Sequence, residues 1–327
     1  MPDLRPLGQT GLAVAPLMLG GNVFGWSADA RTSFAILDAF CDAGFNAIDT
    51  ADVYSTWVPG HRGGESEEII GAWLAASGAR DRVMLATKIG ALPASADGQE
   101  WNSDLSAGHI VRAVEASLRR LHTDRIDLCQ VHLDDGSTPV EETLEAFARL
   151  MDAGKVRAIG ASHFTRARLV EALDTAARRP SLPAYATYQF RYNLLDREEG
   201  ETQFLPLCRE RTVSALCYSA LAKGYLTGRY RGEDAVVAGQ WPAALRRYAE
   251  TDRGEILTVL TEVASQCGTS LAAAALAWVV SKPGVAAAIV AVNSPAELAQ
   301  ACAATSCRLS ADQIAVLDAV GTSSINL

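Results

Sequence analysis

Eight short apolar segments recur along this sequence, and each is separated from the next by a stretch with helical spacing. The segments lie at 16–21, 45–49, 83–88, 126–131, 156–161, 184–190, 213–218 and 285–292. They are continuous rather than alternating in polarity, which is typical of strands buried on both faces of a parallel sheet. Eight strand–helix repeats in a chain of 327 residues predict an α/β fold, a (β/α)8 TIM barrel, with 1–327 forming a single domain.

Helical patterns between the apolar segments support a barrel. Two apolar stripes are formed by Ile110, Val114, Leu118 and Leu121 and by Val140, Leu144, Phe147 and Met151. A doubly wound open sheet is the alternative fold. Such a sheet normally has a Gly-x-Gly-x-x-Gly turn after its first strand, and the first strand here continues as LGGNVFGW.

Three segments match the capping box of a helix start. They read TPVE at 138–141, SPAE at 294–297 and SADQ at 310–313. We therefore expect Thr138, Ser294 and Ser310 to cap helices. The stretches at 90–105 and 222–250 predict long βα loops, which carry functional residues in barrels.

The charge and the cysteines limit the function classes. A formal net charge of -9 without a basic block argues against nucleic acid and against an anionic membrane surface as partners. No apolar run reaches the ~18 residues of a membrane helix, and the first residues lack an apolar signal-peptide core. The seven cysteines include no C-x-x-C pair, which favours reduced thiols. We expect a cytoplasmic protein, as a monomer or small homo-oligomer.

Ionisable residues follow three neighbouring strands where each strand ends. Asp49 and Lys88 end the second and third apolar segments, His132 follows the fourth, and Tyr54 lies in the loop after Asp49. The carboxyl ends of barrel strands meet at one mouth, so these side chains are expected to be neighbours. Asp49 would hold Lys88, and Lys88 would lower the pKa of Tyr54 toward neutrality. The group is suited to acid–base catalysis on a carbonyl or an alcohol.

A metal-dependent barrel hydrolase is a weaker alternative. It would need clustered histidine and acidic ligands, and the five histidines show neither H-x-H nor H-E-x-x-H spacing. We therefore predict no metal site.

The chain resembles the aldo-keto reductases, which are NAD(P)-dependent oxidoreductases built on this barrel. The resemblance covers nearly the whole chain, through LGQTGLAVAPLMLGG, GFNAIDTADVY, ATKIG, VH, GKVRAIGASHF, YNLLDR and YSALAKGYLTGRY. It implies an N-terminal β-hairpin, a catalytic tetrad of Asp49, Tyr54, Lys88 and His132, and an extended cofactor bound without a Rossmann domain.

The resemblance also implies cofactor contacts. Ser162 and Gln189 match residues that hold the nicotinamide amide, with His163 in place of a usual asparagine, and Tyr218 matches the residue that stacks on the ring. Ser219, Leu221, Lys223 and Gly224 match the pyrophosphate loop, and Asn293, Ser294, Glu297 and Gln300 match the segment at the adenosine end. Ala291 and Glu297 stand where members that prefer NADP usually have basic residues. A carboxylate there would repel a 2′-phosphate, so we expect NAD(H) to be slightly favoured over NADP(H).

Aromatic residues after the first strands are candidates for the substrate pocket. The aromatic candidates are Phe24, Trp26, Trp57 and, less surely, Trp101 and Trp241, and Asn22 is a polar candidate beside them. Such walls suit a sugar ring, an aromatic aldehyde or a terpenoid-like ketone. The sequence thus predicts an NAD(P)-dependent carbonyl reductase or an alcohol or aldose dehydrogenase. The alternative is a cofactor-binding regulatory subunit with little turnover, as in the potassium-channel β-subunits that the family includes.

Overall fold

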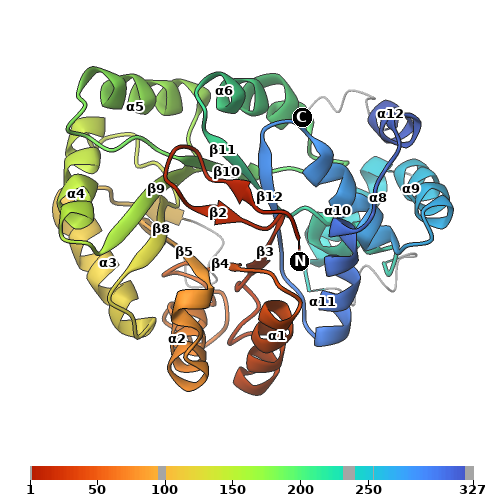
Figure 1. Cartoon of the computed structure of the whole chain (residues 1–327), viewed down its shortest axis with the longest axis horizontal. Coiled ribbons are helices and arrows are strands. Elements are labelled where there is room, and N and C mark those ends of the chain that lie inside the picture. Colours follow the sequence, from red (N-terminus) through yellow and green to blue (C-terminus); the bar gives the residue numbers. More distant parts are fainter. Residues whose placement is uncertain (1, 95–100, 231–239, 253, 321–327) are drawn as a thin grey trace.

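The computed structural model describes residues 2–94, 101–230, 240–252 and 254–320, and in these residues eight parallel strands close a barrel (Figure 1). The strands are β3 (Leu17–Gly20), β4 (Ala47–Asp49), β5 (Met84–Ile89), β8 (Ile126–Val131), β9 (Val156–Ser162), β10 (Thr187–Arg191), β11 (Ser214–Tyr218) and β12 (Val285–Val290). Each falls within or overlaps one of the eight apolar segments. The predicted TIM barrel is therefore confirmed.

Helices surround the barrel (Figure 1). They are α1 (Ala30–Asp42), α2 (Glu65–Ser77), α3 (Ala107–Arg120), α4 (Val140–Asp152), α5 (Arg166–Arg178), α6 (Leu205–Glu210), α8 (Pro242–Asp252), α9 (Glu255–Gln266), α10 (Leu271–Ser281), α11 (Pro295–Cys302) and α12 (Ala311–Ala319), with shorter turns at Ala79–Arg82, Gly200–Phe204, Ala222–Thr227 and Ala303–Thr305. Both apolar stripes expected from the sequence lie on helices, α3 and α4, and their residues are buried or pack against the core.

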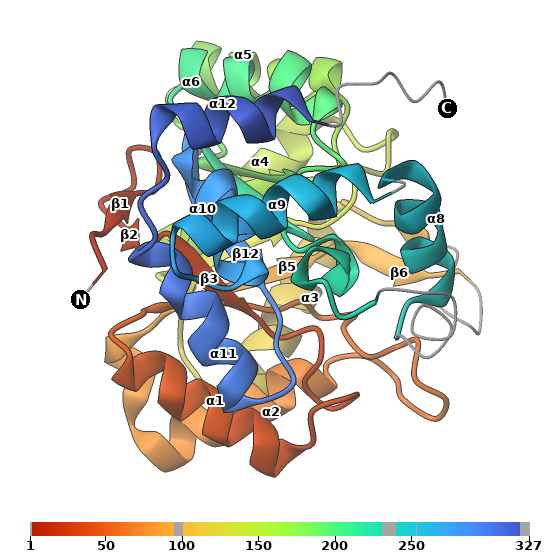
Figure 2. The ribbon, with the colours of Figure 1, turned by 90° about the vertical axis from the view of Figure 1, so that its right-hand side faces the viewer.

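The two ends of the barrel differ. The hairpin of β1 (Arg5–Pro6) and β2 (Ala13–Val14) lies over one end, where Leu7, Leu12 and Val14 pack against the barrel interior. The N-terminal hairpin is thereby confirmed. A second hairpin, β6 (Ala91–Pro93) with β7 (Trp101–Ser103), lies toward the other end together with α8 (Figure 2). Parts of the two expected long loops, 95–100 and 231–239, lie outside the described residues.

Strand periodicity places the polar side chains at the barrel mouth. Ala47 and Ala86 belong to the interior cluster of the barrel. Side chains on a strand alternate between its two faces, so Asp49 and Lys88, two residues further on, point to the same interior. They form the next layer toward the carboxyl ends of the strands. Both side chains are only 1% exposed.

One of the three predicted helix caps is wrong. Ser294 and Ser310 accept hydrogen bonds from the backbone N–H groups of Glu297 and Gln313, as expected. Thr138 does not cap α4, which begins after Pro139 without a side-chain cap. The Thr138 hydroxyl instead donates to Asp135 at 2.5 Å, since that carboxylate lies within the same tight turn.

No single helix in the described part of the chain is both long and apolar enough to cross a membrane. Only α9 and α10 taken together meet the length and composition test, and they are bent by 94° with respect to each other.

Candidate active site

The Lys88 ammonium is the centre of a buried hydrogen-bonded cluster. Its Nζ donates to Asp49 Oδ2 at 2.6 Å, to the Thr50 carbonyl at 2.8 Å and to the Tyr54 hydroxyl oxygen at 2.8 Å. An ammonium group has three protons, so this geometry uses all of its donors. Burial lowers the pKa of Lys88, but Asp49 and Tyr54 outweigh burial, and the net pKa is raised. Lys88 is therefore a permanent cation at the barrel mouth.

Two glutamines complete the surroundings of Asp49. Its Oδ1 accepts from Gln130 Nε2 at 3.1 Å and from Gln189 Nε2 at 3.0 Å. Both oxygens of the carboxylate are thus partnered, which offsets the cost of burying its charge. Gln130 is a functional residue that the sequence reasoning missed. It stands two residues before His132 on the same face of β8, and that spacing was the available signal.

The loop after β4 brings Tyr54 over the mouth. The Ser55 backbone has φ of 76°, and its buried hydroxyl donates to the Phe24 carbonyl at 3.0 Å. A left-handed residue with a short polar side chain turns the chain sharply at this point. Tyr54 also packs in a small apolar cluster with Val53 and Trp101. The loop is therefore fixed on both sides of the tyrosine.

The expected lowering of the Tyr54 pKa is wrong for the protein alone. Burial raises the pKa of Tyr54 more than the neighbouring Lys88 ammonium lowers it, and the Asp49 carboxylate adds to the rise. The sequence identified Lys88 as the neighbouring cation, but it does not show how far burial of Tyr54 opposes the effect of Lys88 on the pKa. Tyr54 consequently keeps its proton at neutral pH, as a proton donor requires.

His132 stands beside the tyrosine and is neutral. The two ring centroids are 6.0 Å apart, with the planes at 76°. Burial lowers the pKa of His132 well below its ordinary value, and the charge of Lys88 lowers it further. His132 Nδ1 is buried and has no hydrogen-bond partner among the described residues. A neutral imidazole can still donate one N–H to a carbonyl oxygen.

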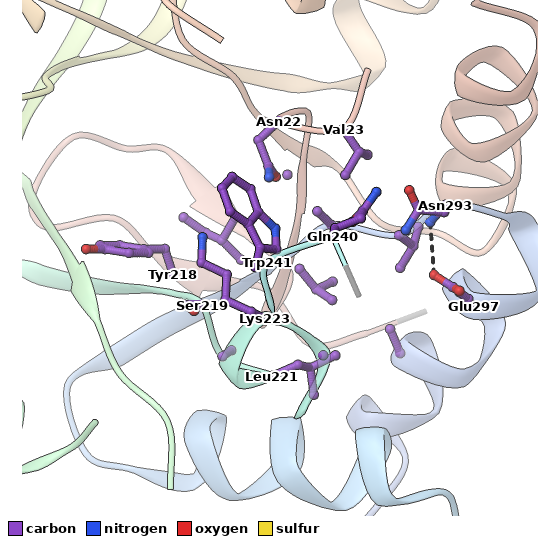
Figure 3. Close-up of a pocket in the computed structure, with 18 of the residues that line it drawn as sticks. Asn22, Val23, Tyr218, Ser219, Leu221, Lys223, Gln240, Trp241, Asn293 and Glu297 are labelled. Atoms are coloured by element: carbon purple, nitrogen blue, oxygen red, sulfur yellow. Dashed lines mark hydrogen bonds between the residues drawn. The ribbon is translucent and has the colours of Figure 1, made fainter. Parts of the chain in front are cut away.

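All four members of the predicted tetrad lie within reach of one cavity of about 300 Å³, and three of them, Asp49, Tyr54 and His132, line it. Its other lining residues include Asn22, Trp57, His163, Gln189, Tyr218, Ser219, Leu221, Lys223, Gly224, Asn293, Glu297 and Gln300 from the predicted site, and Trp241 and Arg229 in addition. Figure 3 shows Tyr218 on one side of this pocket and Glu297 on the other. The pocket therefore runs from the tetrad to the start of α11.

Some predicted residues do not line the pocket. Ser162 is buried, and its hydroxyl donates to the Gln189 carbonyl at 2.9 Å. Ser294 caps α11. Phe24 is fully buried, Trp101 packs beside Tyr54, and Trp26 lies behind the lining, with its ring 5.7 Å from that of Trp57 and 5.1 Å from that of Trp241. Their contacts with cofactor or substrate stay predictions.

The loop 219–230, which follows β11, has an unusual backbone. Ser219, Ala222 and Lys223 have φ values of 55°, 49° and 55°, in the left-handed region that non-glycine residues rarely occupy. Gly224 follows with φ of 92°. The Ser219 hydroxyl oxygen is buried and has no partner among the described residues. Strain and an unpaired donor in the same loop are typical of a ligand site.

Lys223 extends from this loop across the pocket. Its ammonium lies 4.3 Å from the centroid of the Trp241 ring, a cation–π contact (Figure 3). Burial, with a further contribution from the charge of Arg191, lowers the pKa of Lys223 to about 8. The group is a cation at neutral pH and becomes neutral just above it.

Glu297 at the far end of the pocket is already partnered. Its Oε2 accepts from the Asn293 backbone N–H at 3.0 Å, and its Oε1 accepts from Arg229 at 2.8 Å. The Glu297 backbone N–H donates to Ser294 at 3.2 Å, so the residue is part of the helix cap as well. Sequence reasoning missed Arg229 because it lies 68 residues from its partner in the chain.

The residues of this pocket fit a nicotinamide dinucleotide. Lys223 and Arg229 supply cations, and the left-handed Gly224 lets backbone approach a phosphate closely, as a larger residue would not. The unpaired Ser219 hydroxyl supplies a further donor. These groups belong to the loop after β11, whereas Asp49, Lys88 and His132 stand at the ends of β4, β5 and β8. An extended dinucleotide would thus have its phosphates near the loop 219–230 and its reactive ring near the tetrad.

Comparisons with known proteins agree with this geometry. The model of the Aldo/keto reductase family matches residues 16–322. An uncharacterized oxidoreductase, YrpG of Bacillus subtilis, is 37% identical over 286 residues, covering 87% of this chain and 85% of YrpG. The aldo-keto reductase YhdN of the same organism is 34% identical over 289 residues, 86% of this chain and 80% of YhdN.

A probable voltage-gated potassium channel subunit beta of Oryza sativa subsp. japonica is similar too. It is 34% identical over 295 residues, covering 86% of this chain and 84% of the rice protein. The family match spans most of the sequence. The matched residues include the strands of the closed barrel and the buried cluster of Asp49, Lys88 and Tyr54. The chain belongs to the aldo/keto reductase family.

Proposed function

We propose that this protein is an NAD(P)H-dependent carbonyl reductase that converts an aldehyde or ketone to the alcohol. The observation that carries the proposal is the hydrogen bond of 2.8 Å from the Lys88 ammonium to the Tyr54 hydroxyl, inside a pocket that also holds the neutral His132. A protonated phenol supported by a fixed cation is a general acid ready for use.

The residues divide the work as follows. NAD(P)H, when bound, is the source of the hydride. Tyr54 donates its phenolic proton to the carbonyl oxygen of the substrate as negative charge develops there, and Lys88 stabilises the phenolate that remains. His132 donates an N–H to the same oxygen and orients it. Asp49 keeps Lys88 charged and in place.

Reduction is the favoured direction at neutral pH. Oxidation of an alcohol or a sugar would need the Tyr54 phenolate as a base, and burial raises the pKa of this phenol. Alcohol oxidation should therefore accelerate with rising pH, whereas carbonyl reduction should not need alkaline conditions.

Arg229 bears on the choice between NAD(H) and NADP(H). The expectation of an NAD(H) preference rested on the lack of a basic residue around Glu297. Arg229 supplies one, and its side chain is still 45% exposed while it pairs with that carboxylate. We therefore propose that the protein uses NADP(H) as well as NAD(H), with Arg229 available to a 2′-phosphate.

The test is an initial-rate assay with purified protein, NADPH or NADH, and a set of aldehydes and ketones. Cofactor-dependent reduction that is lost in Tyr54→Phe would support the proposal. An absence of turnover in both directions, with both cofactors, would overturn it.

A regulatory function is the second candidate. The similarity to a probable potassium channel subunit from rice favours it. In that case the protein would bind the cofactor and turn over carbonyls negligibly. The same assay, combined with a cofactor-binding titration, separates the two functions, because binding without turnover would support this second candidate.

A further inference from the structure

Arg191 stands at the barrel mouth, outside the roles assigned so far. On β10 the side chain of Gln189 points inward and contacts Asp49. Arg191 is two residues further on, so it points to the same side one layer nearer the mouth. Its register partner on β11 is Tyr218, which lines the pocket. Arg191 is exposed and is not itself among the lining residues, so its guanidinium lies beside Tyr218 at the rim of the pocket.

The charge of Arg191 is not consumed by an ion pair. Among the described residues no carboxylate oxygen lies within 4.0 Å of its guanidinium. Asp196 is the carboxylate that acts on it most, and both oxygens of Asp196 are occupied. Oδ1 accepts from Arg247 at 3.2 Å, and Oδ2 accepts from Tyr248 and from Asn193. An exposed arginine without a close counter-ion has capacity to bind an anion.

The positive charge of Arg191 acts on two residues that line the pocket, Tyr218 and His163. Its guanidinium lies 6.0 Å from the centroid of the Tyr218 ring, and the His163 ring lies 5.6 Å from the same ring. Burial, together with the charge of Arg191, lowers the pKa of His163 to about 4. His163 is thus neutral near pH 7, and the positive charge beside Tyr218 is that of Arg191.

Part of the pocket lining is aromatic. Trp57 and Trp241 both line it, with ring centroids 6.2 Å apart. Tyr54 lies beside Trp57, with centroids 6.0 Å apart. A substrate carbonyl at Tyr54 would therefore have the Trp57 indole beside it, with the Arg191 guanidinium at the rim of the same pocket.

We propose that Arg191 determines substrate specificity by holding a carboxylate of the substrate, so that the preferred substrates are aldehydes or ketones that carry a carboxylate on an apolar or aromatic body. The planar guanidinium matches a carboxylate in two parallel hydrogen bonds. The tryptophan wall accepts the apolar body. This inference rests on the proposed reductase function, and it adds the class of substrate.

The test compares two substrates that differ in one charge. They are para-carboxybenzaldehyde and its neutral amide, para-formylbenzamide. Wild-type protein should reduce the acid with a higher kcat/KM than the amide. Arg191→Gln should lower kcat/KM for the acid by about 10- to 100-fold, mainly through KM, and change the value for the amide by less than about twofold. Arg191→Lys should recover part of the loss, because it restores charge without the fork.

A matched control removes a distant arginine. Arg179, at the end of α5, is half exposed and pairs with Glu145 at 2.8 Å, so Arg179→Gln makes the same charge change away from the pocket. It should leave the ratio of acid to amide unchanged. Equal losses for both substrates in Arg191→Gln, or no wild-type preference for the acid, would overturn the proposal.

Equilibrium binding separates this inference from the reductase function. Calorimetric titration of both benzaldehydes into protein with saturating NADP⁺ requires no turnover. Weaker binding of the acid in Arg191→Gln alone would support the carboxylate site even if neither aldehyde were reduced. Equal affinities of wild-type protein and Arg191→Gln for the acid would overturn it even if both were reduced.

Discussion

The two ends of the pocket are built in opposite ways. At the tetrad, Asp49 and Lys88 are each 1% exposed, they come from strand ends, and every hydrogen-bonding position of Lys88 is filled by protein. In the loop 219–230, Lys223 has a left-handed backbone, the Ser219 hydroxyl lacks a partner among the described residues, and Arg229 is 45% exposed.

This difference separates the groups that carry out the chemistry from the groups that would bind the cofactor. The chemical end is preorganised, so its charges are set before any ligand arrives and need no rearrangement during reaction. The binding end keeps strain and unsatisfied groups that a ligand can relieve. Changes at the tetrad should therefore alter stability and rate together, whereas changes in the loop should alter affinity.

The largest expected effect is at Lys88. Lys88→Met leaves the buried Asp49 carboxylate without its cation, so the free energy of unfolding should fall by about 3–5 kcal/mol. The rate constant for reduction should fall by at least about 100-fold, because Tyr54 loses the group that stabilises its phenolate. Urea unfolding and single-turnover kinetics would measure both.

A surface lysine gives the control for that variant. Lys155 pairs with Glu115 and is 38% exposed, so Lys155→Met should cost less than about 1 kcal/mol and leave the rate unchanged. Equal stability losses in the two lysine variants would show that the tetrad is not the preorganised end of the pocket.

The next effect concerns cofactor choice. Arg229→Leu should weaken NADPH binding by about tenfold relative to NADH, since it removes the cation available to a 2′-phosphate. Glu297→Gln should shift the ratio the other way by removing a competing anion. Fluorescence titration with each cofactor gives the ratio, and thermal unfolding should change little in either variant. A ratio that moves in neither variant would place the phosphate elsewhere.

Lys223 gives a smaller, pH-dependent effect. Its pKa of about 8 makes it a cation below that pH and neutral above it. NADH keeps its pyrophosphate charge over this range, so NADH affinity should fall several-fold as the pH rises from about 7 to about 10. Lys223→Met should bind NADH weakly at all these pH values and lose the dependence. A wild-type affinity that rises with pH would contradict this assignment.

The smallest expected effect is that of pH on the rate of the chemical step. Tyr54 has a raised pKa and His132 has a lowered one, so neither changes its protonation between about pH 6 and pH 9. Single-turnover reduction of a neutral aldehyde at saturating NADPH should vary by less than about twofold over that range. A bell-shaped profile near neutrality would mean that one of the two groups titrates there.

The sequence was sufficient for the fold because strands buried on both faces must be continuous in apolar character. It also predicted that Asp49, Tyr54, Lys88 and His132 would be neighbours, since carboxyl ends of neighbouring barrel strands meet at one mouth. The pairing of Arg229 with Glu297 could not be predicted in the same way. It depends on how a long loop returns to the barrel, which no local pattern records.

Two other differences have energetic causes. The pKa of Tyr54 rises because desolvation exceeds the effect of Lys88, and burial is a property of the folded chain. Thr138 does not cap α4 because the N-cap falls one residue later, at Pro139, while Asp135 accepts from both the backbone N–H and the hydroxyl of Thr138 within a short turn. In both cases the difference arises from contacts that form only in the folded chain.

The most direct test of the account is single-turnover hydride transfer in Tyr54→Phe, with NADPH binding measured in the same preparation. The account predicts a rate about 10²- to 10⁴-fold below wild type, together with a cofactor Kd changed by less than about twofold. An unchanged rate would contradict Tyr54 as the proton donor. A lost rate together with lost NADPH binding would contradict the separation of the pocket into a chemical end and a binding end.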